Sequence, residues 1–364
     1  MNYAPRAAKK RVVEDGAFPV AAIGLDHGHI FGMCAGLVDA GATLSAVWDP
    51  DPRKVEQFRA MFPGARAAGS RDEVLDDASI HLVASAAVPS ERGPLGLAVQ
   101  EAGKHYFSDK APFTTPEQLA SARQSVAATG RIWAVCYSER VQNEAAVFAG
   151  QLIDEGAIGR VIQVVGLGPH RLRAESRPAW FFERKYYGGI LIDIGSHQIE
   201  QFLAFSGASS AEVVHSKVGN LAHPEYPELE DFGDASLVAD NGASNYFRVD
   251  WFTPDGLSTW GDGRTFILGT KGYIELRKYV DVAHKAIENT VLLVDGRGEH
   301  RFECTGTVGF PYFGALILDC LEGTENAMGQ EHTFLAAQLC MDAQSRAEII
   351  TPNFDTNGRV RDDR

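Results

Sequence analysis

A lysine that follows a short apolar segment is the first residue of the chain that suggests chemistry. Residues 102–112 read Ala-Gly-Lys-His-Tyr-Phe-Ser-Asp-Lys-Ala-Pro, so Lys110 stands in a turn just before a proline. Gly103 suits the left-handed residue that follows a helix, and Pro112 prevents simple continuation of a strand. A residue held where a strand of an α/β sheet ends lies on the side where such sheets bind ligands. We therefore predict that Lys110 takes part in chemistry rather than in solubility.

A second candidate site is the turn between the first predicted strand and the first predicted helix. Residues 24–29 read Gly-Leu-Asp-His-Gly-His. Dinucleotide-binding turns carry G-x-G-x-x-G, so that backbone amides and the start of the helix can meet the pyrophosphate. Gly24 matches the first glycine, whereas Asp26 and His29 occupy the positions of the second and third. Asp26 is equally well explained as the N-cap of the helix.

An acidic residue at the end of the second predicted strand strengthens the dinucleotide interpretation. Asp49 could accept hydrogen bonds from both ribose hydroxyls of NAD and would repel the 2′-phosphate of NADP. Arg53 leaves NADP open as an alternative, and Asp49 could instead cap a proline-rich turn. The residues predicted to bind the cofactor, NAD or NADP, are Gly24, Asp26, His27, Gly28, Asp49, Arg53, Ala86, Asp109 and Lys110.

His27 and His29 also form a His-x-His pattern, which metal-dependent amidohydrolases use at the end of a strand. A metal centre needs a third and a fourth ligand, and no nearby cluster in the sequence supplies them. We therefore expect no metal at this turn. Contacts of the two histidines with the nicotinamide or the substrate, or simple packing, are the expected alternatives.

Asp193 and His197 form the third candidate site. They are four positions apart after a Gly-Gly pair, so they are predicted to share one face of a helix. A histidine beside a carboxylate keeps its orientation and gains basicity near neutral pH, although such a pair can also be structural. Hydride transfer from an alcohol needs a base and a cation near the developing alkoxide. Lys110 could supply the charge and His197 the base, or the two could share the proton transfer.

These segments resemble the glucose–fructose oxidoreductase/inositol dehydrogenase/MocA (Gfo/Idh/MocA) family. Residues 102–112 are similar to its A-G-K-H-V…E-K-P segment, and residues 188–197 to its G-G-G-x-L-x-D-x-G-x-H segment. The resemblance covers roughly residues 18–350. It implies an α/β chain with an N-terminal Rossmann dinucleotide-binding domain, followed by an α+β domain with a large, mostly antiparallel sheet.

The resemblance also implies an activity and an assembly. It implies NAD(P)-dependent oxidation or reduction of sugars, polyols or related cyclic substrates, with Lys110, Asp193 and His197 as the catalytic residues. Members of the family often pair through the open face of the sheet, so we expect a homodimer or homotetramer.

Several residues before Asp193 are expected to face the same cleft. Aromatic side chains such as Trp180 and Tyr187 suit stacking on sugar rings, whereas Arg171 and Arg177 suit a carboxylate. Each of them could instead pack in a core or an interface. The residues predicted to bind the substrate are His170, Arg171, Trp180 and Tyr187.

The order of predicted elements gives the domain organisation. Residues 18–140 alternate short apolar strands with helices, which indicates a parallel sheet with helices on both faces. Residues 141–350 contain strands joined by short turns, which indicates antiparallel pairing and a substrate-binding and oligomerisation domain. Residues 1–17 are interpreted as a tail or a partner-docking arm, and residues 351–364 as a tail. Pro94 is predicted in the first turn of a helix.

Composition excludes some classes of partner. The 364-residue chain has a formal net charge of -14, which disfavours general binding to nucleic acids and to anionic membranes. Five cysteines lie far apart without a C-x-x-C pair, as in a cytoplasmic protein with reduced thiols. No stretch approaches the roughly 20 apolar residues of a membrane span.

The sequence as a whole favours an NAD(P)-dependent oxidoreductase that acts on CH–OH groups. One alternative is an enzyme that keeps NAD bound and cleaves glycosidic bonds through transient oxidation. Another is a non-catalytic sensor, although the presence of Lys110, Asp193 and His197 argues against it. A metal-dependent hydrolase would require His27 and His29 to bind a metal.

Overall fold

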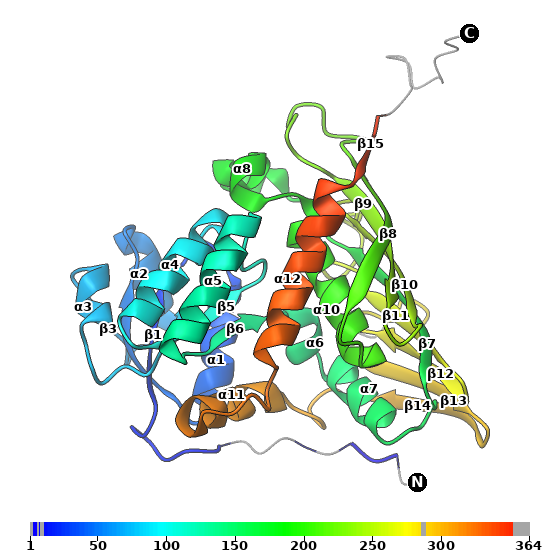
Figure 1. The fold of residues 1–364 in the computed structure, drawn as a ribbon, viewed down its shortest axis with the longest axis horizontal. Helices are drawn as coiled ribbons and strands as arrows, with labels where there is room; N and C mark the ends of the chain where they lie inside the picture. Colours follow the sequence, from blue (N-terminus) through cyan, green and yellow to red (C-terminus); the bar gives the residue numbers. More distant parts are fainter. Residues whose placement is uncertain (1–2, 6, 8–10, 285–288, 352–364) are drawn as a thin grey trace.

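A parallel sheet of six strands forms the first layer of the protein (Figure 1). The computed structural model describes residues 3–5, 7, 11–284 and 289–351. The strand order β3-β2-β1-β4-β5-β6, with all pairs parallel, is that of the Rossmann fold and confirms the prediction. The strands are β1 (Pro19–Ile23), β2 (Thr43–Trp48), β3 (Arg66–Ala67), β4 (Leu82–Ser85), β5 (His105–Asp109) and β6 (Trp133–Cys136).

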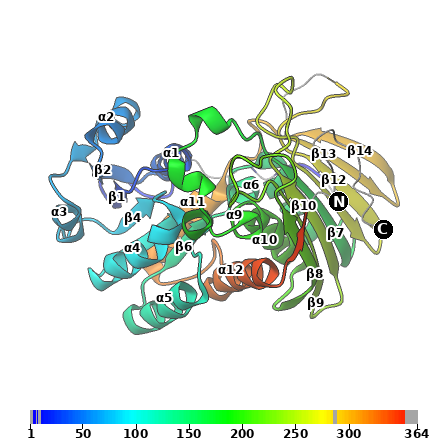
Figure 2. The ribbon, with the colours of Figure 1, turned by 90° about the horizontal axis from the view of Figure 1, so that it is seen from above.

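Helices cover both faces of this sheet (Figure 2). Successive side chains of a strand point to opposite faces, so Val20 and Ala22 pack in one core and Ala21 and Ile23 in another. Helices α1 (His29–Asp39) and α2 (Pro52–Met61) contribute to the first core. The other core receives α3 (Arg71–Leu75), α4 (Pro89–Glu101) and α5 (Pro116–Thr129).

Helix α4 corrects one sequence prediction. It begins at Pro89, so Pro94 lies inside the helix and not in its first turn. A proline in a helix has no N–H for the carbonyl four residues earlier, which here is that of Ser90. The side chain of Gln118 in α5 donates to this carbonyl at 2.8 Å. A neighbouring helix therefore supplies the hydrogen bond that Pro94 cannot make, which the local sequence does not reveal.

A second sheet has nine strands in the order β14-β13-β12-β11-β7-β10-β9-β8-β15. Its pairs are antiparallel except β7 with β10 and β8 with β15, which confirms a mostly antiparallel sheet. The strands are β7 (Val161–Pro169), β8 (Ala211–Gly219), β9 (Phe232–Ala239), β10 (Ser244–Asp250), β11 (Arg264–Gly269), β12 (Gly272–Arg277), β13 (Thr290–Asp295), β14 (Gly298–Glu303) and β15 (Glu348–Ile350). The sequence did not predict β3, β14 or β15.

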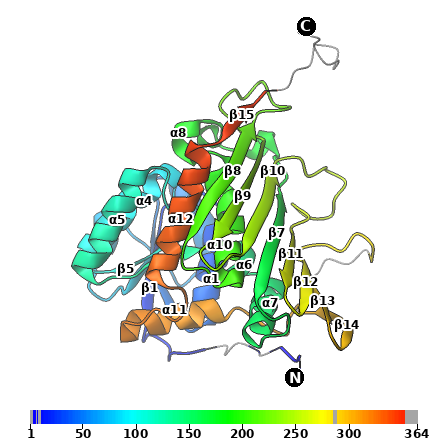
Figure 3. The ribbon, with the colours of Figure 1, turned by 45° about the vertical axis from the view of Figure 1, so that its right-hand side comes forward.

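The remaining helices lie between the two sheets or beside the first one. Figures 1 and 3 show the helices on the inner face of the second sheet, while no described helix covers its outer face. They are α6 (Ser138–Val141), α7 (Glu144–Asp154), α8 (Arg184–Tyr187), α9 (Ile190–Asp193), α10 (Gly195–Ser206), α11 (Pro311–Glu322) and α12 (Gln330–Ser345), with the 3-10 turns η1 (Ala174–Ser176) and η2 (Ala179–Phe182).

The C-terminal helices also complete the first sheet. Tyr312 in α11 donates its hydroxyl to the carbonyl of Val135 at 3.1 Å. The side chain of Gln330 in α12 accepts from the N–H of Trp133 and donates to its carbonyl, both at 2.9 Å. Edge strand β6 thus has hydrogen-bond partners beyond β5. Segments from the predicted second domain are therefore part of the first layer.

The described residues near the N-terminus pack on their own chain. Val12 donates its N–H to the carbonyl of Ala40 at 2.9 Å. The hydroxyl of Tyr3 bonds Asp295 at 2.5 Å, and the guanidinium of Arg297 lies over its ring. Part of the predicted N-terminal tail thus contacts both layers, whereas most of the predicted C-terminal tail lies outside the described residues.

All five cysteines are free, and four of them are buried, which confirms the expectation of unpaired thiols. In the part of the chain that the structure describes, no helix has the length and apolarity needed to cross a bilayer.

Candidate active site

A cavity of about 310 Å³ lies at the carboxyl ends of β1 and β5, facing α9 and the aromatic residues before it. This is the edge at which open α/β sheets bind ligands. The cavity is lined by His27, His29, Pro89, Arg92, Lys110, His170, Arg171, Arg177, Trp180, Phe181, Tyr187, Asp193, Trp251 and Trp260.

Lys110 and Asp193 form an ion pair inside this cavity. The Nζ atom of Lys110, just after β5, lies 2.5 Å from Oδ1 of Asp193, the last residue of α9. Both side chains are largely buried, with 6% and 14% of their surface exposed. Burial raises the pKa of Asp193, but the ammonium of Lys110 outweighs burial and leaves the pKa below its usual value. The pair therefore presents an ammonium donor to anything bound in the cavity.

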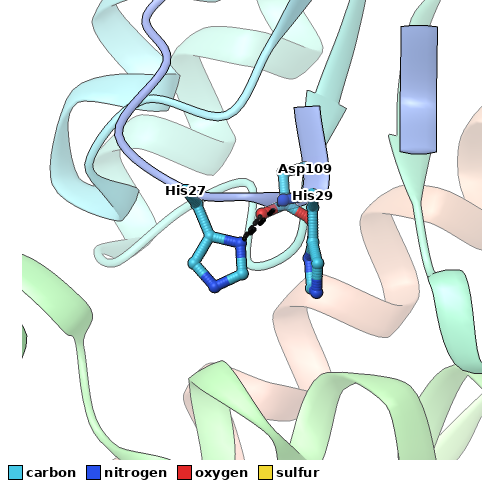
Figure 4. Close-up of side chains that lie close together, drawn as sticks. All are labelled: His27, His29 and Asp109. Atoms are coloured by element: carbon cyan, nitrogen blue, oxygen red, sulfur yellow. Dashed lines mark hydrogen bonds and ion pairs between the residues drawn. The ribbon is translucent and has the colours of Figure 1, made fainter. Parts of the chain in front are cut away.

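Asp109 organises a second group of side chains beside Lys110 (Figure 4). Its buried carboxylate lies 2.9 Å from Nδ1 of His29 and 3.5 Å from Nδ1 of His27, and accepts from Arg92 at 3.1 Å. Burial raises the pKa of Asp109, but His29 and Arg92 outweigh it and hold the pKa well below its usual range. Burial also holds the pKa of His27 well below its usual value.

The contact with Asp109 fixes the tautomer of His29. An ionised carboxylate can only accept, so Nδ1 of His29 carries the proton that it shares with Asp109, and Nε2 is left as an acceptor. Figure 4 shows both imidazole rings projecting from the turn, with the edge opposite Asp109 directed away from it. A carboxylate that holds a histidine through Nδ1 fixes the orientation and the tautomer of the ring for proton transfer.

The same three side chains are close enough together to share a metal ion. However, the oxygens of Asp109 already accept from the guanidinium of Arg92 and from the N–H of Lys110, at 3.1 and 2.8 Å. A cation bound there would lie beside Arg92 and Lys110, which Coulomb repulsion opposes. The hydrogen bonds by themselves account for the arrangement.

The predicted pairing of Asp193 with His197 is wrong. The N–H of His197 bonds the carbonyl of Ile194, three residues earlier, so α9 and α10 do not form one regular α-helix in which a spacing of four aligns side chains. His197 is 2% exposed and does not line the cavity, and its Nδ1 has no hydrogen-bond partner in the part of the chain that the structure describes. Burial lowers the pKa of His197 to about 3 despite the nearby carboxylate of Glu139.

A buried ion pair lies behind the cavity. The Nζ atom of Lys278 is 2.7 Å from Oε2 of Glu139, and both side chains are buried. Gln198 donates to the same oxygen at 3.2 Å. Oε1 of Glu139 faces Nε2 of His170 at 3.9 Å, and burial lowers the pKa of His170 to about 4. Glu139 and Lys278 thus support the side of the cavity that His170 lines.

The predicted substrate-binding residues line the cavity, but two of them are also tied into the fold. The hydroxyl of Tyr187 donates to the carbonyl of Glu228 at 2.9 Å, so only its ring is free for a ligand. Nη2 of Arg171 donates to the carbonyls of Pro254 and Leu257 at 2.9 and 2.6 Å. Trp180 remains half-buried in the wall of the cavity.

Sequence reasoning missed four lining residues: Pro89, Arg92, Trp251 and Trp260. Arg92 lies in α4, which begins at Pro89, whereas the sequence prediction placed Pro94 in the first turn of this helix. Trp251 directly follows β10, and Trp260 lies in the loop before β11; their rings approach that of His170, with centroids 5.4 and 4.4 Å away. The position of Trp251 at a strand end was the one available signal.

The turn after β1 fits the start of a dinucleotide site. Gly24 has φ of +75°, and a Cβ at this position would approach the Cβ of Ala87 to 2.7 Å, so glycine is required. Ala86 fixes the turn, since its carbonyl accepts from His27 at 2.9 Å and its N–H donates to Gly24 at 3.0 Å. The N-cap of α1 is Gly28 and not Asp26. Asp26 pairs instead with Lys54 at 2.6 Å. The ammonium of Lys54 offsets the negative charge of Asp26 at the turn where a pyrophosphate would bind.

Asp49 lies at the carboxyl end of β2, where a ribose would be recognised. Its buried carboxylate accepts from the N–H groups of Leu25 and Asp51, at 2.7 and 2.9 Å. Its side chain is fully buried, and Nζ of Lys54 lies 3.7 Å from its Oδ1. Arg53 points elsewhere and pairs with Asp51 at 2.8 Å on the surface. These residues fit a dinucleotide, with Asp49 also supporting the turn itself.

Comparison with known proteins agrees with this geometry. Residues 147–275 match the model of the GFO/IDH/MocA C-terminal domain. A crystal structure of a candidate oxidoreductase from Erwinia carotovora atroseptica SCRI1043 is 51% identical, covers 92% of this chain and 100% of its own, and superposes with a TM-score of 0.89. The chain belongs to the Gfo/Idh/MocA family. This confirms the family resemblance.

More distant relatives are named dehydrogenases. A scyllo-inositol 2-dehydrogenase (NAD(+)) of Bacillus subtilis is 28% identical over 64% of this chain and 66% of its own length. A levoglucosan dehydrogenase of Pseudarthrobacter phenanthrenivorans is 30% identical over 45% of this chain and 42% of its own. A second B. subtilis relative is named for NADP(+). The matches thus span about two fifths to two thirds of these relatives.

Proposed function

We propose that the protein is an NAD(P)-dependent oxidoreductase that transfers hydride between the nicotinamide and a hydroxyl or carbonyl group of a sugar, polyol or related cyclic substrate. The observation that carries this proposal is the Lys110–Asp193 ion pair in a cavity at the carboxyl edge of the Rossmann sheet. The relatives named as inositol and levoglucosan dehydrogenases support the reaction class.

The residues that would hold the cofactor are those of the first turn and the end of β2. Gly24 and the start of α1 would meet the pyrophosphate, and Asp49 would meet the ribose hydroxyls. Ala86 and His27 would contact the part of the cofactor that leads into the cavity. NAD is expected in preference to NADP because Asp49 carries a negative charge and Arg53 is paired with Asp51. When bound, the nicotinamide accepts or returns a hydride.

Two side chains, each held by a carboxylate, would act on the reacting hydroxyl group. The ammonium of Lys110, held by Asp193, would donate a hydrogen bond to its oxygen and stabilise the developing alkoxide. Because Lys110 is a donor in this pair, the proton needs another acceptor. Nε2 of His29, whose Nδ1 is held by Asp109 at 2.9 Å, lines the same cavity and would take it. The C–H bond breaks with its electron pair leaving as hydride, and a carbonyl forms.

The sequence predicted His197 as the base. We now propose a positioning role for it instead. It lies behind the cavity wall, near Glu139 and Lys110. From there it would position neighbouring side chains rather than touch the substrate.

The test is NADH formation with a panel of sugars, inositols and sugar acids. We expect at least one substrate to be oxidised by the wild-type protein, and Lys110→Met to lower kcat about 100-fold or more because it removes the cation from the alkoxide. Binding of NAD, followed by fluorescence titration, should change little in this variant. Full activity of Lys110→Met would refute the mechanism, and NADPH formation favoured over NADH would refute the role of Asp49.

We also propose that the outer face of the second sheet joins two copies of the chain. Apolar side chains on four adjacent strands are exposed there, each by about two fifths of its surface: Ile162, Val238, Tyr246, Phe266 and Leu268. Contiguous exposed apolar surface commonly marks an interface. A homodimer or a homotetramer built from such dimers would cover it.

A cytoplasmic location is proposed as well, in keeping with five cysteines that are all free. Neither nucleic acid nor membrane is proposed as a partner, since the net charge of -14 disfavours polyanions.

A further inference from the structure

Arg177 differs from the other cations of the cavity. Arg92 lies 3.1 Å from Asp109, Lys110 lies 2.5 Å from Asp193, and Arg171 lies 3.6 Å from Asp255. Among the described residues, no carboxylate lies within ion-pair distance of Arg177. Acidic residues are not scarce in this chain, which has 48 of them against 34 basic residues. Even so, no described carboxylate pairs with Arg177, and its guanidinium charge is left without a matching anion in the cavity.

The guanidinium of Arg177 is nevertheless fixed in place. Its Nε donates to the carbonyl of Leu172 at 2.9 Å, and its Nη2 to that of Arg171 at 3.3 Å. It lies over the rings of Phe181 and Trp251, 4.5 and 5.2 Å from their centroids. Stacking on aromatic faces and hydrogen bonds to carbonyls orient the guanidinium but do not neutralise it. Its Nη1 has no hydrogen-bond partner among the described residues.

The surroundings of Arg177 match one class of ligand. A half-buried guanidinium with a free donor edge pairs best with a carboxylate, because the charge-assisted bonds are short and strong. Trp180 and Trp260 line the same cavity and offer flat apolar faces to a sugar or cyclitol ring. Asp193 is the acidic group whose charge acts most on Arg177, so the guanidinium is electrostatically close to the Lys110–Asp193 pair.

We propose that the substrate carries a carboxylate, which Arg177 binds while Lys110 meets the reacting hydroxyl group. This inference rests on the proposed function. The substrate class is that of sugar acids and carboxylated polyols or cyclitols, and neutral sugars of the same size are poorer ligands.

The experiment compares matched pairs that differ in the carboxylate: D-glucuronate with D-glucose, D-galacturonate with D-galactose, and D-gluconate with D-glucitol. Binding is measured by calorimetry in the presence of NAD, and oxidation by NADH formation. For the wild-type protein we expect at least one acid to bind about tenfold or more tightly than its neutral partner. Arg177→Gln should abolish this preference, and Arg177→Lys should keep part of it because the charge remains without the planar fork.

Arg173→Gln is the matched control, because Arg173 is an exposed arginine of the same loop that does not line the cavity. It should keep the preference for acids, and circular dichroism should show all three variants folded. Equal binding of acids and neutral partners, no binding of any acid, or a preference that survives Arg177→Gln would each overturn the inference. Selective binding of acids without any NADH formation would refute the proposed function alone. Oxidation of neutral sugars without a preference would refute the inference alone.

Discussion

Asp109 shows how one residue can define a site. Its side chain is completely buried, yet it contacts two imidazoles, a guanidinium and the amide of Lys110. The positive groups around it keep it ionised, so it holds His29 through Nδ1, while Nδ1 of His27 accepts the N–H of His29. A buried carboxylate that orients a neighbouring base is a common arrangement in catalysis. At the scale of the residue, Asp109 and Asp193 are thus orienting groups for His29 and Lys110.

This assignment predicts different effects for two histidines. His29→Gln should lower kcat about 100-fold, since general-base catalysis contributes roughly that much or more. His197→Gln should have a smaller effect on kcat, because His197 does not line the cavity. The measurement is kcat for the best substrate found in the panel, with folding checked by circular dichroism. A larger loss in His197→Gln than in His29→Gln would return the role of base to His197.

At the scale of the elements, one buried carboxylate links three helices. Glu200 in α10 accepts from Nε of Arg140 in α6 at 2.6 and 2.9 Å, and lies 3.1 Å from His332 in α12. Burial raises the pKa of Glu200, but Arg140 and His332 outweigh it and lower the pKa to about 2. These helices lie between the two sheets, so the interaction holds the inner layer together.

The lowered pKa of Glu200 predicts how stability depends on pH. The folded-state value lies below the unfolded value of about 4.3, so the stabilisation is complete above that pH. It is lost as the pH falls through this range towards about 2. Glu200→Gln should flatten the fall of the melting temperature over the same interval and cost roughly 3 kcal/mol at neutral pH, because Arg140 loses its partner. Melting curves of both proteins from pH 7 to 2 test this, and parallel curves would contradict it.

At the scale of the whole molecule, the two sheets differ in what covers them. The first sheet has helices on both faces, whereas the second has them on its inner face (Figures 1 and 3). Parallel sheets need both faces covered, while antiparallel sheets can leave one face to solvent. The outer face of the second sheet carries five exposed apolar side chains, which is why a second copy is proposed there.

The proposed interface predicts a change of oligomeric state. Phe266→Arg places a charge in the apolar patch and should convert the assembly to monomers, or weaken it about tenfold or more. Met61→Arg is the control, because Met61 is an exposed apolar residue of α2 far from the second sheet. Light scattering during size-exclusion chromatography gives the mass of each. A monomeric wild-type protein, or loss of assembly in the control alone, would contradict the proposal.

The sequence by itself determined most of the elements and the motifs at their ends. Apolar runs and glycines placed β2 at Thr43–Trp48 and α5 at Pro116–Thr129 as the structure has them. These signals are local, since each depends on the chain within a few residues. For the same reason the Gly24 turn, Lys110 and Asp193 could be recognised as parts of one site from three short segments.

The tertiary structure decided which of these side chains meet. It joined Lys110 to Asp193, left His197 behind the cavity wall, and brought Arg92 to Asp109. It also paired Glu139 with Lys278, which lie 139 positions apart in the sequence. Such contacts depend on how helices and sheets pack, and no spacing along the chain encodes them. The free charge of Arg177 is of this kind as well, because only the folded protein shows that no described carboxylate reaches it.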